Sequence, residues 1–279
     1  MKKLVTLLCL FYCFSAFSQI TPSLVRKALS EATGISFPHL HDPKPVERFY
    51  QENEYRPVWL NDTRSFLQKQ LITLLYSAPE FGLDTKDYQL ATLQELTGLH
   101  RIKDAADSAF TELILTDALL HFLKDLHSGT QPPLLAFEGY RAAPDPLKAV
   151  TYLSTALEHE SLEGLAADAE PEMPAYQQAK RLFSLLSTTL NSADFTDILI
   201  RSDLVSNTNI PLLTRLQQFG FLDSTHTVSD KALVKKVQQA QLLFNLRNDG
   251  ILNPNTRAAL NVSLRQRREE VKRALNLFR

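Results

Sequence analysis

The sequence predicts a mainly α-helical protein. Apolar residues recur at spacings of three and four along several segments, which is typical of amphipathic helices, and prolines separate those segments. The 279 residues include only 8 Gly, too few for the many glycine turns of an all-β sandwich or barrel. Hydrophobic residues make up 44% of the chain and charged residues 22%, so a folded protein is expected.

The first element, residues 1–18, has the pattern of a signal peptide. Two lysines precede an apolar run from Leu4 to Phe14, which at about 11 residues is too short to span a bilayer. Small residues at Ala16 and Ser18 suit a signal peptidase, so we expect cleavage after Ser18. An uncleaved anchor is the alternative. The protein is therefore expected to be exported, and periplasmic if the cell has an outer membrane.

Removal of this segment would change the chemistry available to the chain. Cys9 and Cys13 are the only cysteines, so a cleaved chain could form no disulfide, thiolate metal site or cysteine nucleophile. The segment holds two of the 30 basic residues and none of the 31 acidic ones, so the net charge of −1 becomes −3. A slightly negative net charge argues against binding to nucleic acids. The sequence also has no glycine-rich phosphate loop, which argues against binding to nucleotides.

Three helices are expected in the first two thirds of the chain. Residues 63–77 carry leucines at helical spacing, and residues 103–127 form the strongest pattern, a leucine-rich stripe along one face. Residues 174–190 repeat this pattern. The stretches 130–146 and 166–174 are rich in proline or acidic residues and are expected to be loops.

Trp59 is the only tryptophan in the chain. It lies in Val58–Leu60, which follows Pro57 and is expected to be a short extended piece. Because a lone tryptophan in an apolar run is usually buried, we expect it to fill the core of the helical part. A platform for stacking sugars is the alternative.

The titratable residues of this part form no recognisable catalytic or metal-binding pattern. His39 and His41 lie two residues apart in a proline-rich segment and are expected to be solvated, because a metal site needs three or four ligands. Asp117 is expected to hydrogen-bond to a neighbouring element. A catalytic pair of Asp117 with Asp125 would need a second carboxylate across a cleft. His127 is expected to end its helix.

Three short helices are expected in the C-terminal third, followed by a basic amphipathic helix over Ser263–Phe278. In the first helix, the apolar stripe is Leu212, Leu216 and Phe219, and Gly220 ends it. In the second, Ser229 or Asp230 is the cap, and the stripe is Leu233, Val237, Ala240 and Phe244. The third covers Thr256–Leu260, with Asn253 as its cap and Pro254 in its first turn. Three helices of this length can bury one small core.

Residues 210–261 resemble a peptidoglycan-binding repeat of the three-helix type. The resemblance rests on the spacing of the apolar residues and on the run DGILNPNTRAAL over 249–260. The chain departs from the common pattern at Ala240, because an aromatic residue usually precedes the glutamine that is Gln241 here. It also has Asn253 where glycine is commoner. Neither change is expected to break the fold.

The resemblance extends over most of residues 45–279. The runs RPVWL at 56–60, GLDTKDY at 82–88 and LTDALL at 115–120 look like the helical scaffold domain of large periplasmic L,D-transpeptidases. The run NVSL at 261–264 looks like that family's bridge to its catalytic domain. The implied domains are a signal peptide at 1–18, a helical scaffold domain at 19–205, a peptidoglycan-binding-like domain at 206–262 and a linker helix at 263–279.

Two functions compete under this resemblance. In the family, a catalytic cysteine in a Ser-His-Gly-Cys-x-Arg motif follows the bridge, and this sequence has no such motif. The first hypothesis is a non-catalytic cell-wall protein that binds peptidoglycan or a partner cell-wall enzyme. The second is a truncated or split L,D-transpeptidase, whose last helix would expose an apolar stripe that includes Leu264, Val271, Leu275 and Phe278.

The candidate peptidoglycan contacts lie around the turn at 245–257. They are Asn245, Asp249, Asn253 and Arg257, and the alternative for Asp249 and Asn253 is a turn-forming and helix-capping role. No catalytic residue, metal ion or cofactor is expected. The last helix region holds seven basic residues against two acidic ones, which indicates a solvated face or a surface that meets anionic polymers.

Overall fold

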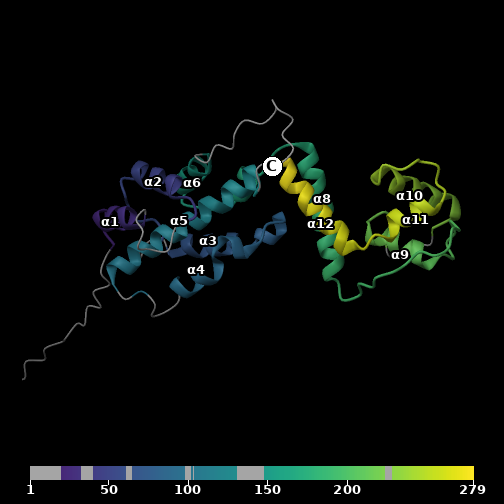
Figure 1. Ribbon diagram of the computed structural model, residues 1–279, viewed down its shortest axis with the longest axis horizontal. Coiled ribbons are helices and arrows are strands. Elements are labelled where there is room, and N and C mark those ends of the chain that lie inside the picture. Colours follow the sequence, from purple (N-terminus) through teal and green to yellow (C-terminus); the bar gives the residue numbers. More distant parts are fainter. Residues whose placement is uncertain are drawn as a thin grey trace, which may run out of the picture. The chain divides into compact units, whose positions relative to one another are not determined.

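The structure, a computed structural model, describes residues 20–32, 40–60, 65–97, 102, 104–130, 148–223 and 228–279. These residues contain twelve α-helices and two short 3-10 helices, with no strand among them, so the predicted mainly α fold is confirmed (Figure 1). Contacts within the chain divide it into two compact units. No helix in the described ranges is long and apolar enough to cross a membrane. The expected signal peptide and His39 lie outside the described residues.

The first unit comprises Met1–Tyr76, Thr85–Leu123 and Asp145–Leu165. Its helices are α1 (Pro22–Ala32), α2 (Pro43–Glu52), α3 (Ser65–Tyr76), η2 (Thr85–Tyr88), α4 (Leu90–Thr97), α5 (Ala105–Ser128, whose last turn belongs to the second unit) and α6 (Lys148–Glu158). The helices expected over 63–77 and 103–127 are confirmed as α3 and α5. The sequence did not predict α1, α4 or α6, because a helix of 8 to 11 residues gives only a short periodic pattern.

Helix α5 is buried on nearly every side, so its buried surface extends beyond the leucine-rich stripe that the sequence predicts. Leu113, Leu115, Leu119 and Phe122 are all fully buried although they point in different directions around the helix. A helix buried all round must also satisfy its polar side chains internally. The polar groups of α5 therefore hold neighbouring segments.

Trp59 is fully buried, which confirms its role in the core and excludes a sugar-stacking platform. Its indole Nε1 donates a 2.8 Å hydrogen bond to Thr116 Oγ1 of α5. The expected extended piece at 58–60 is instead a bend. The bend forms because the backbone N–H groups of Trp59 and its two neighbours all donate to one carboxylate, that of Glu112.

The second unit comprises Ser77–Asp84, Lys124–Pro144 and Ala166–Arg279. Its helices are η1 (Ala78–Phe81), α7 (Leu165–Ala169), α8 (Pro174–Asn191), α9 (Ile210–Gln218), α10 (Asp230–Leu243), α11 (Pro254–Asn261) and α12 (Leu264–Phe278). The helix expected over 174–190 is confirmed as α8. The loop expected over 166–174 is wrong in its first half, which is α7. Three alanines, the strongest helix formers, outweigh the acidic residues there.

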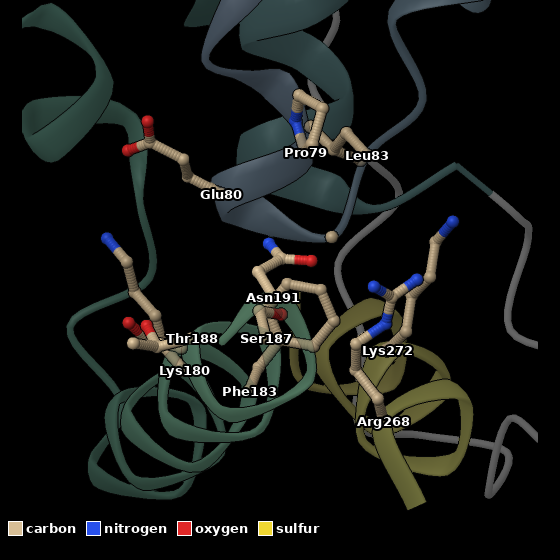
Figure 2. A pocket seen from close by; sticks show the side chains of 12 residues that line it. Pro79, Glu80, Leu83, Lys180, Phe183, Ser187, Thr188, Asn191, Arg268 and Lys272 are labelled. Atoms are coloured by element: carbon tan, nitrogen blue, oxygen red, sulfur yellow. The ribbon is translucent and has the colours of Figure 1, made fainter. Parts of the chain in front are cut away.

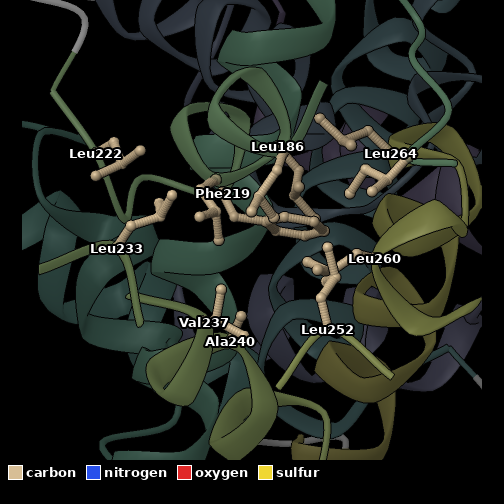
Figure 3. Packing of buried hydrophobic residues seen from close by; sticks show 12 residues of the cluster. Leu186, Phe219, Leu222, Leu233, Val237, Ala240, Leu252, Leu260 and Leu264 are labelled. Atoms are coloured by element: carbon tan, nitrogen blue, oxygen red, sulfur yellow. The ribbon is translucent and has the colours of Figure 1, made fainter. Parts of the chain in front are cut away.

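The three short helices of the C-terminal third share one core (Figure 3). It contains apolar residues from α9, α10 and α11, and also Leu186 from α8 and Leu264 from α12. Burial of each leucine contributes about 1.5–3 kcal/mol. The expected cap at Ser229 is confirmed, because its hydroxyl accepts the N–H of Ala232 at 3.3 Å.

Helix α12 packs along α8, so the expectation of an exposed apolar stripe on the last helix is wrong. Leu264 and Leu275 are fully buried, and Leu275 joins Tyr176 and Phe183 of α8 in a small cluster. The guanidinium of Arg279, the residue after α12, also donates to the carbonyl oxygen of Phe81 in η1. The last helix is therefore an integral part of the second unit.

Candidate functional site

The four predicted contact residues lie where α10 passes through a turn into α11. Gln241, which is fully buried, organises this turn. Its Nε2 donates to Asp249 Oδ1 at 2.8 Å and to the carbonyl oxygen of Ile251 at 3.0 Å, and lies 3.1 Å from Thr256 Oγ1. Its Oε1 accepts the N–H of Gly250 at 2.8 Å. One amide side chain thus fixes the turn at both ends.

Asp249 and Asn253 have the turn-forming and helix-capping roles given above as the alternative. Asp249 Oδ1 also accepts the N–H of Ile251 at 2.9 Å. This bond and the amide of Gln241 hold the pKa of Asp249 below its usual value. Asn253 caps α11, because its Oδ1 accepts the N–H of Thr256 at 2.9 Å. Both side chains are only half-buried, so their roles leave part of each accessible.

Asn245 is exposed and follows the last turn of α10 with a φ of 53°. The N–H of Asn245 donates to the carbonyl of Leu242 at 3.1 Å, and that of Leu246 donates to the carbonyl of Gln241 at 2.8 Å. These two bonds form a Schellman motif with asparagine in the left-handed position that glycine usually takes. Arg257, in α11, donates to the carbonyl oxygen of Arg201 and is half-buried.

Two family models match the chain. The model of the Scaffold domain family matches residues 44–182, and that of the peptidoglycan binding domain family matches residues 212–260. A segment similar to a scaffold domain is therefore followed by a segment similar to a peptidoglycan-binding domain. No curated protein matches the chain.

Several residues that hold the peptidoglycan-binding domain in shape were not identified from the sequence. Gln241 was visible in the sequence only as part of the family pattern, and its contacts depend on the turn at 249–251 folding back onto it. Arg215 is fully buried in α9 and donates to the carbonyl oxygen of Ile198 at 2.8 Å. Asn261 holds the backbone of Ile200 from both sides, with bonds of 2.8 and 2.9 Å. These partners lie far apart in the sequence, so local pattern could not reveal them.

The scaffold domain has its own cluster of titratable groups around Asp117. Asp117 accepts the backbone N–H groups of His41 at 2.8 Å and Asp42 at 3.1 Å, which confirms the expected bond to a neighbouring element. Burial raises the pKa of Asp117 despite these bonds. The rings of His41 and His121 are in contact, with centroids 3.5 Å apart and planes tilted by 34°.

This cluster does not support the catalytic pair considered for the sequence. Asp125 lies eight residues from Asp117 on the same helix, about 12 Å along its axis, which is too far for two carboxylates to share one reacting group. Within the described ranges, no three His, Cys, Asp or Glu side chains are grouped to hold a metal ion. His127 lies in the last turn of α5, where its Nδ1 is 3.0 Å from the carbonyl oxygen of Ala169.

Proposed function

We propose that this chain is a non-catalytic, exported cell-wall protein that binds peptidoglycan. The match of residues 212–260 to the peptidoglycan binding domain family carries the proposal. The scaffold match upstream supports a relation to the L,D-transpeptidases of peptidoglycan cross-linking, because the same order of domains is implied by the sequence resemblance. Export is proposed from the signal-peptide pattern at residues 1–18.

The contacts are proposed to centre on Asn245 and Arg257, with Asp249 and Asn253 shaping the surface between them. An asparagine amide both donates and accepts, which suits the hydroxyl and amide groups of sugars and peptides. An arginine guanidinium pairs with a carboxylate through two parallel bonds. Ile251 is 59% exposed and provides an apolar contact beside Gly250.

The test is co-sedimentation of the full chain with purified sacculi at low salt. We expect the wild-type protein to pellet with the sacculi, and the double variant Asn245→Ala, Arg257→Gln to bind about tenfold more weakly, which corresponds to about 1.4 kcal/mol. Lys231→Gln is the matched control, because this exposed lysine lies in the first turn of α10, about 20 Å along the helix from Asn245.

Two results would contradict this proposal. If the wild-type chain stays in the supernatant, direct binding to the wall is wrong, and a partner cell-wall enzyme becomes the ligand to test. If the control variant weakens binding as much as the double variant does, the contact surface is misplaced. Thermal melts of each variant establish that a loss of binding does not reflect unfolding.

A further inference from the structure

A groove of about 460 Å³ lies in the second unit, away from the turn described above (Figure 2). It is bounded by the η1 turn, by α8 and by α12. All three elements belong to the same compact unit. The groove is therefore a built feature of this packed unit.

One wall of the groove is a polar face of α8. Each of its lining residues lies three or four positions from another of them, which places them on one side of the helix; they are Lys180, Phe183, Ser184, Ser187, Thr188 and Asn191. From Lys180 to Asn191 this face extends for about 16 Å. Three hydroxyl groups and one amide lie along it (Figure 2). These groups both donate and accept hydrogen bonds.

The adjacent wall carries two cations of α12, Arg268 and Lys272, one turn apart. Within the described parts of the chain, no acidic group lies within 4 Å of Lys272 Nζ. Arg268 pairs at 3.0 Å with Glu269, and both side chains are more than a third exposed, so this pair contributes little and is readily exchanged. A third cation, Lys180, is held by Glu170. Among the described residues that line the groove, these three cations face a single acidic side chain, that of Glu80 in η1, so the lining carries a net positive charge.

The floor of the groove is apolar and closely packed. Phe183 is 3% exposed. Gly82 approaches it so closely that an added Cβ would lie 3.7 Å from Phe183 Cζ and 3.3 Å from Leu275 Cδ1, and its φ of 70° also favours glycine. An apolar floor with a few convergent polar groups is typical of a ligand site.

We propose that this groove binds the stem peptide of peptidoglycan through its carboxylates. Arg268 and Lys272 would pair with carboxylate groups, while the hydroxyl and amide groups of α8 bond to the peptide and to the sugar that carries it. A groove of this length accommodates an extended ligand. The inference rests on the proposed function and adds to it a second contact, separate from the turn between α10 and α11.

The experiment is a calorimetric titration of the full chain with a soluble disaccharide-tetrapeptide prepared from peptidoglycan. We expect the double variant Arg268→Gln, Lys272→Gln to bind this muropeptide about tenfold more weakly than wild type, since two charge-assisted contacts are lost. Arg273→Gln is the matched control, because Arg273 is exposed on the same helix and does not line the groove. Amidation of the muropeptide carboxylates is expected to weaken wild-type binding similarly.

Parallel sedimentation with sacculi separates this inference from the proposed function. If wild-type chain pellets with sacculi but the groove variant binds muropeptide as tightly as the control, the inference alone is overturned. If wild type binds neither sacculi nor muropeptide, both proposals fail. Inorganic phosphate is titrated as a third ligand, and binding as tight as that of the muropeptide would overturn the assignment to a carboxylate-bearing peptide.

Discussion

Replacement of Glu112 by alanine is expected to lower the free energy of unfolding of the first unit by about 3–5 kcal/mol. Glu112 is fully buried in α5, and its carboxylate accepts the backbone N–H groups of Val58, Trp59 and Leu60. The hydroxyl of Tyr50 also lies 3.3 Å from Oε1. Alanine would leave these three N–H groups, two of them buried and that of Leu60 partly buried, without an acceptor and would create a cavity. Removal of a buried carboxylate offsets part of this loss.

The fluorescence of Trp59 can measure this change in stability. Trp59 is the only tryptophan and its backbone contacts Glu112 directly, so its fluorescence reports unfolding of this unit during denaturant titration. Glu112→Gln serves as the matched control, because the amide keeps the shape and one good acceptor, and we expect it to lose less than half as much stability. Equal midpoints for wild type and Glu112→Ala would show that the bend does not depend on this carboxylate.

Wild type and Glu112→Gln are also expected to differ in how their stability depends on pH. Burial raises the pKa of Glu112 above its usual value of 4.5, although the three N–H bonds oppose this effect. A carboxyl group with a raised pKa in the folded state binds more protons there than in the unfolded state, so its contribution to stability is largest below pH 4.5 and falls as the pH rises. The stability difference between wild type and Glu112→Gln is therefore expected to decrease from pH 4.5 toward neutrality.

The sequence predicted the helices whose apolar spacing and caps are local. Residues 174–190 and the helix that follows Ser229 are examples, since the apolar stripe of each lies within one segment and Ser229 caps the second. The sequence did not predict that α5 is buried all round, because the apolar spacing within one helix does not show how many neighbouring elements cover that helix. The bend at 58–60 was likewise missed, since its cause is a carboxylate more than 50 residues away.

The candidate site shows the same limit. Local turn chemistry correctly indicated a cap at Asn253 and a turn at Asp249. The groove, in contrast, combines η1, α8 and α12, which are separated by up to about two hundred positions in the chain, and no local pattern connects them. The last helix was misjudged for a related reason: its apolar residues looked unpartnered because their partner, α8, lies about ninety positions upstream.

Replacement of Gln241 by alanine is expected to destabilise the peptidoglycan-binding domain by about 2–4 kcal/mol. The loss arises because the N–H of Gly250, Asp249 Oδ1 and the carbonyl oxygen of Ile251 would all lose a buried partner. Hydrogen exchange of the Gly250 amide measures the effect locally, and we expect this amide to exchange much faster in the variant. Binding to sacculi is expected to fall with it, because the turn that carries Asp249 would no longer be fixed.

Gln239 offers the matched control, because it lies on the same helix and is exposed. Gln239→Ala removes the same amide from a surface position, so we expect it to change stability by less than about 0.5 kcal/mol and to leave the exchange of Gly250 unchanged. If Gln241→Ala unfolds the whole domain, exchange and binding are lost together and the structural role of the amide is established. If Gly250 remains protected in a folded Gln241→Ala protein, the turn is held by its own residues, and the amide is not what positions the surface proposed to contact peptidoglycan.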